Sequence, residues 1–113
     1  MSSINKIPSE WYKIKQDDSF EKACRATALL VAEVVIAKQN DYGHGNILAF
    51  KEQGLVVRLW DKINRLMNLV WFGNQAKNES TEDTFTDIAG YAIIGLMLAN
   101  NTFTRELKEK KNG

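Results

Sequence analysis

The sequence has few of the residues that build disulfides and zinc sites. Its 113 residues include one cysteine, one proline and one histidine. A single cysteine excludes an internal disulfide and suits a reducing compartment. A single histidine excludes a zinc site made of several histidines. We therefore expect a cytoplasmic protein, in the host cytoplasm if the chain is viral, with Cys24 in the core.

Net charge and long apolar runs are also lacking. Fifteen basic and fourteen acidic residues give a net charge of +1, so no overall field favours nucleic acid or a membrane surface. The N-terminal segment is polar, unlike a signal peptide, and the longest apolar stretches are too short or too interrupted to cross a bilayer. We expect neither nucleic acid nor a membrane as a partner.

What the sequence does contain is helical periodicity, with weak strand signals. The pattern covers three segments, near residues 18–40, 54–72 and 81–100. Asp18 and Glu21 have the spacing of a capping box at the start of the first segment. Ser80 or Thr81 can cap the last one. These features predict an all-α fold, a small helical bundle.

The length fits one domain. We expect it to span residues 18–100, between an N-terminal arm at 1–17 and a charged tail at 101–113. Residues 88–99 are apolar nearly all round, which is typical of a helix buried on several sides. Two other helices cannot cover it, so we expect a dimer or tetramer that buries residues 85–99.

Isolated carboxylates stand beside or inside two apolar segments. Glu33 lies within LLVAEVVIA and Asp87 precedes IAGYAII, and burying an unpaired carboxylate is costly. Asp83 shares a helix face with Asp87, and carboxylate oxygens suit Mg²⁺. We predict a Mg²⁺ site of Glu33, Asp83 and Asp87, with Glu33 and Asp87 catalytic. The alternatives are that Glu33 pairs with an arginine or faces a wet groove, and that Asp83 caps its helix.

Charged residues also cluster on the middle helix. Arg58, Lys62 and Arg65 recur at three- and four-residue steps, with Asp61 between them. This spacing favours either a ladder of surface salt bridges or a phosphate-binding group beside the metal site.

Three segments of the chain carry a family resemblance when they are taken together and in this order: residues 38–46, 54–69 and 78–94. They resemble the phage and bacterial family called nucleotide modification associated domain type 1. The residues that carry the resemblance are Lys38, Asp41, Tyr42, Gly43, Arg58, Asp61, Lys62, Arg65, Leu66, Glu79, Ser80, Asp83, Thr84, Asp87, Ala89 and Tyr91. The resemblance implies that a nucleotide is bound by Lys38, Asp41, Tyr42, Arg58, Asp61, Lys62 and Arg65.

The family is similar in layout to the MazG-like all-α nucleoside triphosphate pyrophosphohydrolases, which hold Mg²⁺ between acidic pairs on facing helices. This sequence departs from that layout, because Ile36 and Ala37 stand three and four residues after Glu33, where an acid is expected. Fewer ligands imply weaker metal binding or no catalysis.

Two functions are implied by the resemblance together with these residues. The first is Mg²⁺-dependent hydrolysis of a nucleoside triphosphate to a monophosphate and pyrophosphate, which would shape a nucleotide pool during phage infection. The second is non-catalytic binding that sequesters a nucleotide signal of host antiphage defence, with Tyr42, Trp60 and Trp71 as stacking partners. A structural oligomer is the third reading. The enzyme is preferred, because one shared cation explains two lone carboxylates on two apolar helices.

Overall fold

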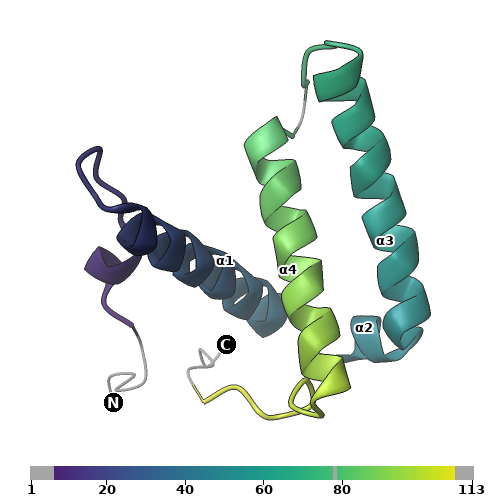
Figure 1. Cartoon of the computed structure of the whole chain (residues 1–113). Coiled ribbons are helices and arrows are strands. Elements are labelled where there is room, and N and C mark those ends of the chain that lie inside the picture. The colour runs from purple at the N-terminus through teal and green to yellow at the C-terminus, as the bar shows by residue number, and fades with distance from the viewer. Residues whose placement is uncertain (1–6, 78, 109–113) are drawn as a thin grey trace. The chain divides into compact units, whose positions relative to one another are not determined.

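The computed structural model describes residues 7–77 and 79–108, and this part of the chain is helical without a strand. Its elements are η1 (Ser9–Tyr12), α1 (Phe20–Tyr42), α2 (Gly45–Leu48), α3 (Lys51–Leu66), η2 (Met67–Trp71) and α4 (Thr81–Ala99) (Figure 1). The predicted all-α fold is confirmed. No helix in the described ranges combines the length and the apolar character needed to cross a membrane.

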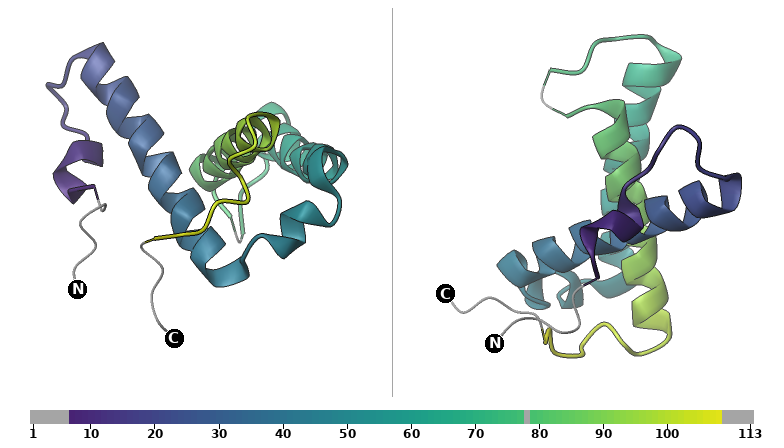
Figure 2. Two further views of the ribbon diagram at one scale, coloured as in Figure 1. Left: turned by 90° about the horizontal axis from the view of Figure 1, so that it is seen from below. Right: turned by 90° about the vertical axis from the view of Figure 1, so that its left-hand side faces the viewer.

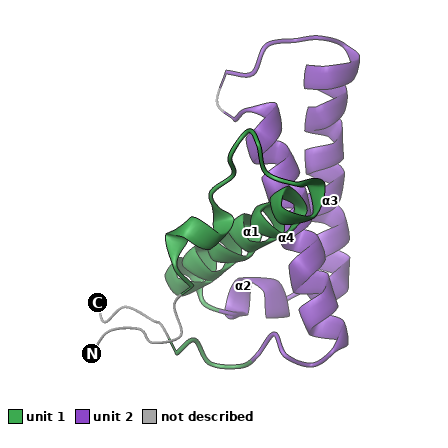
Figure 3. Ribbon diagram, turned by 60° about the vertical axis from the view of Figure 1, so that its left-hand side comes forward, with its two compact units in different colours: residues 1–43, 105–113 green, residues 44–104 purple. Residues whose placement is uncertain are grey.

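The chain divides into two compact units (Figure 3). The first comprises residues 1–43 and 105–113, and within it η1 packs against α1. The second comprises residues 44–104, in which α3 and α4 run side by side in opposite directions (Figures 1 and 2). The predicted domain limits at 17 and 100 stay predictions. Phe103, inside the predicted tail, is buried.

The N-cap of α1 is Ser19, one residue later than the sequence pattern predicts. The Ser19 hydroxyl accepts a hydrogen bond from the Lys22 backbone N–H at 3.1 Å. Asp18 instead accepts the Lys15 backbone N–H at 2.7 Å and pairs with the Lys22 ammonium at 3.1 Å. The Lys15 hydrogen bond, aided by Lys22, lowers the pKa of Asp18. Aspartate and serine are equally good caps, so sequence alone did not separate them. Cys24, predicted in the core, is exposed.

The middle helix is longer at its start than predicted and changes type at its end. It begins at Lys51, whose φ of 50° lies in the left-handed region. After Leu66 the chain continues as a π turn, in which the Phe72 N–H donates to the Met67 carbonyl at 3.0 Å. Gly73, with φ 72°, then ends the helix, because glycine tolerates this conformation without a side-chain clash.

A capping box starts α4. The Asp83 backbone N–H donates to the Ser80 hydroxyl at 3.0 Å, and the Ser80 N–H donates to the Asp83 carboxylate at 3.3 Å. These bonds satisfy backbone donors that a helix start leaves unpaired. Further along, Ile94 of α4 and Leu55 of α3 are both buried, and the Leu55 side chain lies against α4 near Gly95.

We expect Ser80→Ala to lower the free energy of unfolding by about 1 kcal/mol, because it removes the N-cap acceptor of α4. Urea denaturation followed by circular dichroism measures the change. The control is Thr86→Ala, whose hydroxyl donates to the Glu82 carbonyl one turn back. That bond adds little to a helix interior, where alanine is the better helix former. Equal midpoints for Ser80→Ala and the wild type would rule out a stabilising cap.

Candidate functional site

A cluster of four charged side chains joins α3 to the start of α4. The Lys62 ammonium on α3 lies 2.9 Å from the Glu79 carboxylate and 2.9 Å from the Asp87 carboxylate. Arg65, also on α3, places its Nε 3.5 Å from the same Glu79 oxygen. Glu79 precedes α4 and Asp87 lies in its second turn. We call Lys62, Arg65, Glu79 and Asp87 the charge cluster.

Most of the cluster is shielded from water. The Lys62, Asp87 and Glu79 side chains are 17%, 14% and 27% exposed, and Arg65 is 39% exposed. Burial lowers the pKa of Lys62, but hydrogen bonds to Asp87 and Glu79 and the charges of both carboxylates outweigh that effect. The pKa of Lys62 therefore lies above its ordinary value of 10.5. Lys62 carries its positive charge at every physiological pH.

Thr84 contacts the cluster through Glu79. It is fully buried, and its hydroxyl lies 2.8 Å from the Ser80 carbonyl and 3.4 Å from the Glu79 carboxylate. Because a hydroxyl has one proton and the shorter bond is to Ser80, the Glu79 contact is the weaker one. The contacts fix the residues before α4 relative to the helix, and so they position Glu79.

The structure brings together some of the predicted site residues and separates others. Lys62, Arg65 and Asp87 meet in the charge cluster. Arg58 points to the α2 region, where it donates to the Asn46 carbonyl at 3.4 Å. Asp61 is exposed on α3. The spacing on α3 thus does not give one continuous salt-bridge ladder, because its cations bind partners on different elements.

Asp83 and Glu79 make contacts that the predicted metal set does not contain. Asp83, predicted as a Mg²⁺ ligand, uses its carboxylate in the capping box of α4, which is the alternative reading of that residue. Glu79 is absent from the predicted metal set, yet it shares Lys62 with Asp87. Glu79 was missed because it precedes the predicted helix. Its distance of eight residues from Asp87, close to two helical turns, could have indicated that the two carboxylates lie on the same side.

The remaining predicted residues lie on α1, in the first unit. Glu33 is half-buried, and Lys38, Asp41 and Tyr42 are exposed in the last turns of the helix. Gly43 then ends α1 with φ 72°, and its carbonyl accepts the Gln39 amide at 2.6 Å. The predicted convergence of Glu33 with Asp83 and Asp87 stays a prediction.

Residues 38–98 match the model of the family Nucleotide modification associated domain 1. This stretch is more than half of the chain and runs from the last turns of α1 almost to the end of α4. The chain belongs to this family. The resemblance expected from the sequence is thereby confirmed. No match was found among the curated proteins or among the solved structures.

All four members of the charge cluster lie within the stretch that matches Nucleotide modification associated domain 1. Two separate parts of that stretch supply them: Lys62 and Arg65 come from α3, Glu79 and Asp87 from the start of α4. The cluster is therefore the best-defined candidate site that the family match and the geometry have in common.

The donor set of the cluster fits a divalent cation in its chemistry. Carboxylate oxygens of Glu79 and Asp87 converge on one cation position, which the Lys62 ammonium takes in this structure. Mg²⁺ prefers such oxygens. Within the described residues, no group of three or more histidine, cysteine or acidic side chains is arranged around one point, so two carboxylates are what the cluster offers.

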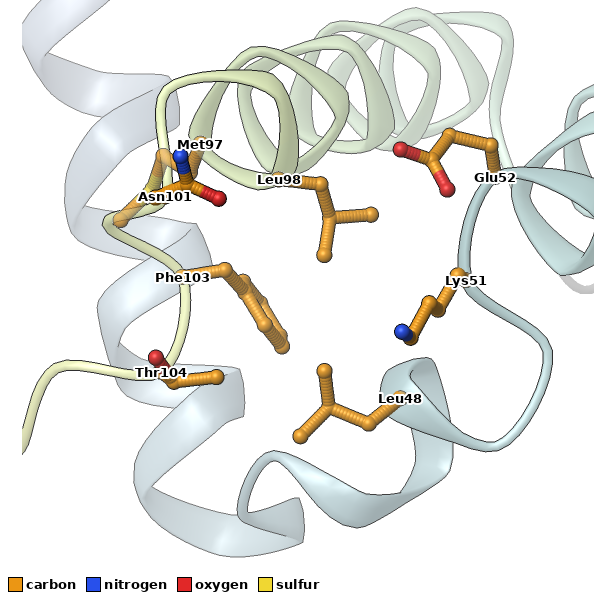
Figure 4. A pocket seen from close by; sticks show the side chains of 8 residues that line it. All are labelled: Leu48, Lys51, Glu52, Met97, Leu98, Asn101, Phe103 and Thr104. Carbon is orange, nitrogen blue, oxygen red and sulfur yellow. The ribbon is translucent and has the colours of Figure 1, made fainter.

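A pocket lies at the other end of the α3–α4 pair (Figure 4). Its volume is about 340 Å³, and its lining residues are Leu48, Lys51, Glu52, Met97, Leu98, Asn101, Phe103 and Thr104. Apolar side chains form the floor, and the Lys51 ammonium and the Glu52 carboxylate lie at one side (Figure 4). None of these residues is among those that carried the family resemblance, so the cluster, and not this pocket, is the basis for the function below.

We expect Lys62→Met and Asp87→Asn each to lower the free energy of unfolding by about 1–3 kcal/mol. Lys62→Met removes the ammonium that two carboxylates share, and Asp87→Asn removes one of the two carboxylates from Lys62. Partial exposure keeps the loss below that of a fully buried pair. The double variant should cost less than the sum, with a coupling energy on the order of 1 kcal/mol. Urea denaturation measures all three. Asp61→Asn, which neutralises an exposed carboxylate, is the control. Additive losses would show that Lys62 and Asp87 do not interact.

The same ion pairs predict a pH dependence. Because folding raises the pKa of Lys62 above 10.5, its contribution is complete below that pH and is lost as pH rises through the folded-state pKa. The stability difference between wild type and Lys62→Met should therefore be constant from about pH 7 to pH 10 and then shrink. Denaturation midpoints across this range test it. A difference that already shrinks near neutral pH would contradict the raised pKa.

Proposed function

We propose that the protein binds the Mg²⁺ complex of a nucleoside phosphate at the charge cluster. The observation that carries this proposal is the meeting of two cations and two carboxylates at one half-buried place, at positions within the family match. A metal–phosphate complex presents charges of both signs. It therefore complements a site that also presents both.

Each pair of side chains has a distinct part in this proposal. Glu79 and Asp87 would hold Mg²⁺ through carboxylate oxygens, while Lys62 and Arg65 would bind phosphate oxygens. Arg65 uses its Nε toward Glu79, so its remaining N–H groups are directed elsewhere and suit a phosphate. Bound at this place, Mg²⁺ would offset phosphate charge and lower the pKa of a coordinated water.

Lys62 gives the site a neutral resting state. Two carboxylates that face each other repel, and the ammonium between them offsets that repulsion. Lysine has a flexible stem and a compact charge, so it can leave the carboxylates and turn to a phosphate when the ligand arrives. The net charge of the cluster and its ligand then changes little, which limits the cost of burying charge.

A second candidate is hydrolysis of the bound nucleoside triphosphate to a monophosphate and pyrophosphate. The convergence of Glu79 and Asp87 on one cation position supports it. Binding is nevertheless the first proposal, because Asp87 is paired with Lys62 and is not the lone carboxylate on which the preference for an enzyme rested. For a phage protein, binding without cleavage suits the sequestering of a host-defence nucleotide signal.

The test is equilibrium binding of a panel of nucleoside mono-, di- and triphosphates, with Mg²⁺ and with a chelator. We expect Lys62→Met to weaken binding of the Mg²⁺ complex by about tenfold, because a phosphate contact is lost, and to strengthen binding of Mg²⁺ alone, because a competing cation is removed. Lys51→Met, which removes an exposed ammonium outside the cluster, is the control and should bind as the wild type does.

Two outcomes would overturn the proposal. One is the absence of binding across the panel by folded wild-type protein. The other is loss of binding in Lys51→Met and not in Lys62→Met, which would move the ligand to the pocket. Chromatography of the bound nucleotide after incubation then separates the two candidates: intact nucleotide supports binding alone, and monophosphate with pyrophosphate supports hydrolysis.

A further inference from the structure

The outer face of α3 and η2 carries an apolar stripe that the second unit leaves open. Seven side chains make up this stripe: Val56, Val57, Trp60, Ile63, Met67, Val70 and Trp71. Their exposed fractions lie between 43% and 79%. Leu55, about 100° around the same helix from Val56, is buried. The stripe therefore lies beside the packed side of α3 and is left exposed.

The spacing within the stripe is that of a helix–helix seam. Val56, Trp60, Ile63, Met67 and Val70 follow one another at alternating steps of four and three residues. Such a 3–4 repeat keeps one apolar line on a helix and packs against another helix with the same repeat. The line is about 21 Å long from Val56 to Val70, and no charged residue interrupts it.

The size of the stripe is that of a protein interface. Its side chains expose an apolar area on the order of 800 Å², about one partner's share of a standard interface. Monomers rarely expose apolar patches beyond a few hundred Å². Two tryptophans lie within it, and tryptophan is among the residues that contribute most to binding energy at interfaces.

We propose that this stripe is the contact surface of a homodimer, in which α3 of one chain packs against α3 of a second copy. A second copy satisfies the three observations together, since it supplies the same 3–4 repeat, the same length and a matching uncharged apolar area. Closed pairing of identical patches is also the commonest form of symmetric assembly. Ile63, at the middle of the stripe, then meets the Ile63 of the second copy.

This surface differs from the one that the sequence favours. Residues 85–99 are the predicted interface, but much of α4 packs on α3, and its large exposed apolar side chains in the second unit are Phe85 and Leu96. Lys62 faces Glu79 and Asp87 and not the stripe. Dimerisation through the stripe is therefore independent of the proposed nucleotide site, and either proposal can fail alone.

The test is the mass of the full-length protein in sedimentation equilibrium. We expect the wild type to be a dimer of 12.8-kDa chains at about 10 µM, within the affinity range of standard interfaces. Trp60→Glu, at a side chain 67% exposed in the single chain, should leave the circular dichroism spectrum unchanged and weaken dimerisation by at least about 100-fold. Val56→Glu is a second variant with the same expectation.

The matched control is Leu96→Glu, whose side chain on α4 is 68% exposed and which should dimerise as the wild type does. In a Cys24→Ser background, Ile63→Cys should form an intermolecular disulfide on mild oxidation and Leu96→Cys should not. A wild-type monomer at about 50 µM would overturn the proposal. So would a dimer that Leu96→Glu dissociates and Trp60→Glu does not.

Discussion

The arrangement of the second unit depends on one shielded ammonium. Lys62 of α3 binds two carboxylates, one before α4 and one in its second turn, and so it joins the two helices at this point. Each ion loses hydration on burial, and only a partner at hydrogen-bonding distance compensates for that loss. The two ion pairs of Lys62 are therefore better understood as a constraint on how α3 and α4 lie against each other than as a large source of stability.

The same ion pairs account for the charges of both signs that the cluster places on α3 and at the start of α4, within the stretch that matches the family. If the carboxylates served only a cation, an excess of negative charge would be expected, and if the cations served only phosphate, an excess of positive charge. The cluster has two of each. A neutral site of this kind is stable without a ligand, and in the proposed function it would exchange internal ion pairs for contacts to a ligand of mixed charge.

The two faces of α3 have separate tasks in this view. One face is polar at Lys62 and Arg65 and is turned toward α4, while the other carries the stripe from Val56 to Trp71. A helix with apolar residues on more than one side needs more than one partner to cover them. Within the second unit α4 covers one side, and in the proposed dimer a second copy of α3 would cover the other.

The sequence by itself determined the helical class, the positions of the main helices to within a few residues, a cap at Ser80 or Thr81, and the family. These depend on local periodicity, local hydrogen bonds and short motifs. The sequence also indicated Lys62, Arg65 and Asp87 as candidate site residues, because a charged side chain on an amphipathic or apolar helix is costly to bury without a partner.

Only the tertiary structure decided which charges meet. Helical spacing relates residues on one helix, but the pairing of Lys62 with Asp87 and the inclusion of Glu79 depend on how α3 and α4 lie against each other. The same holds for the assignment of Asp83 to the capping box and for the exposure of Trp60. Periodicity shows that a helix face is apolar, whereas packing decides whether that face is covered within the chain.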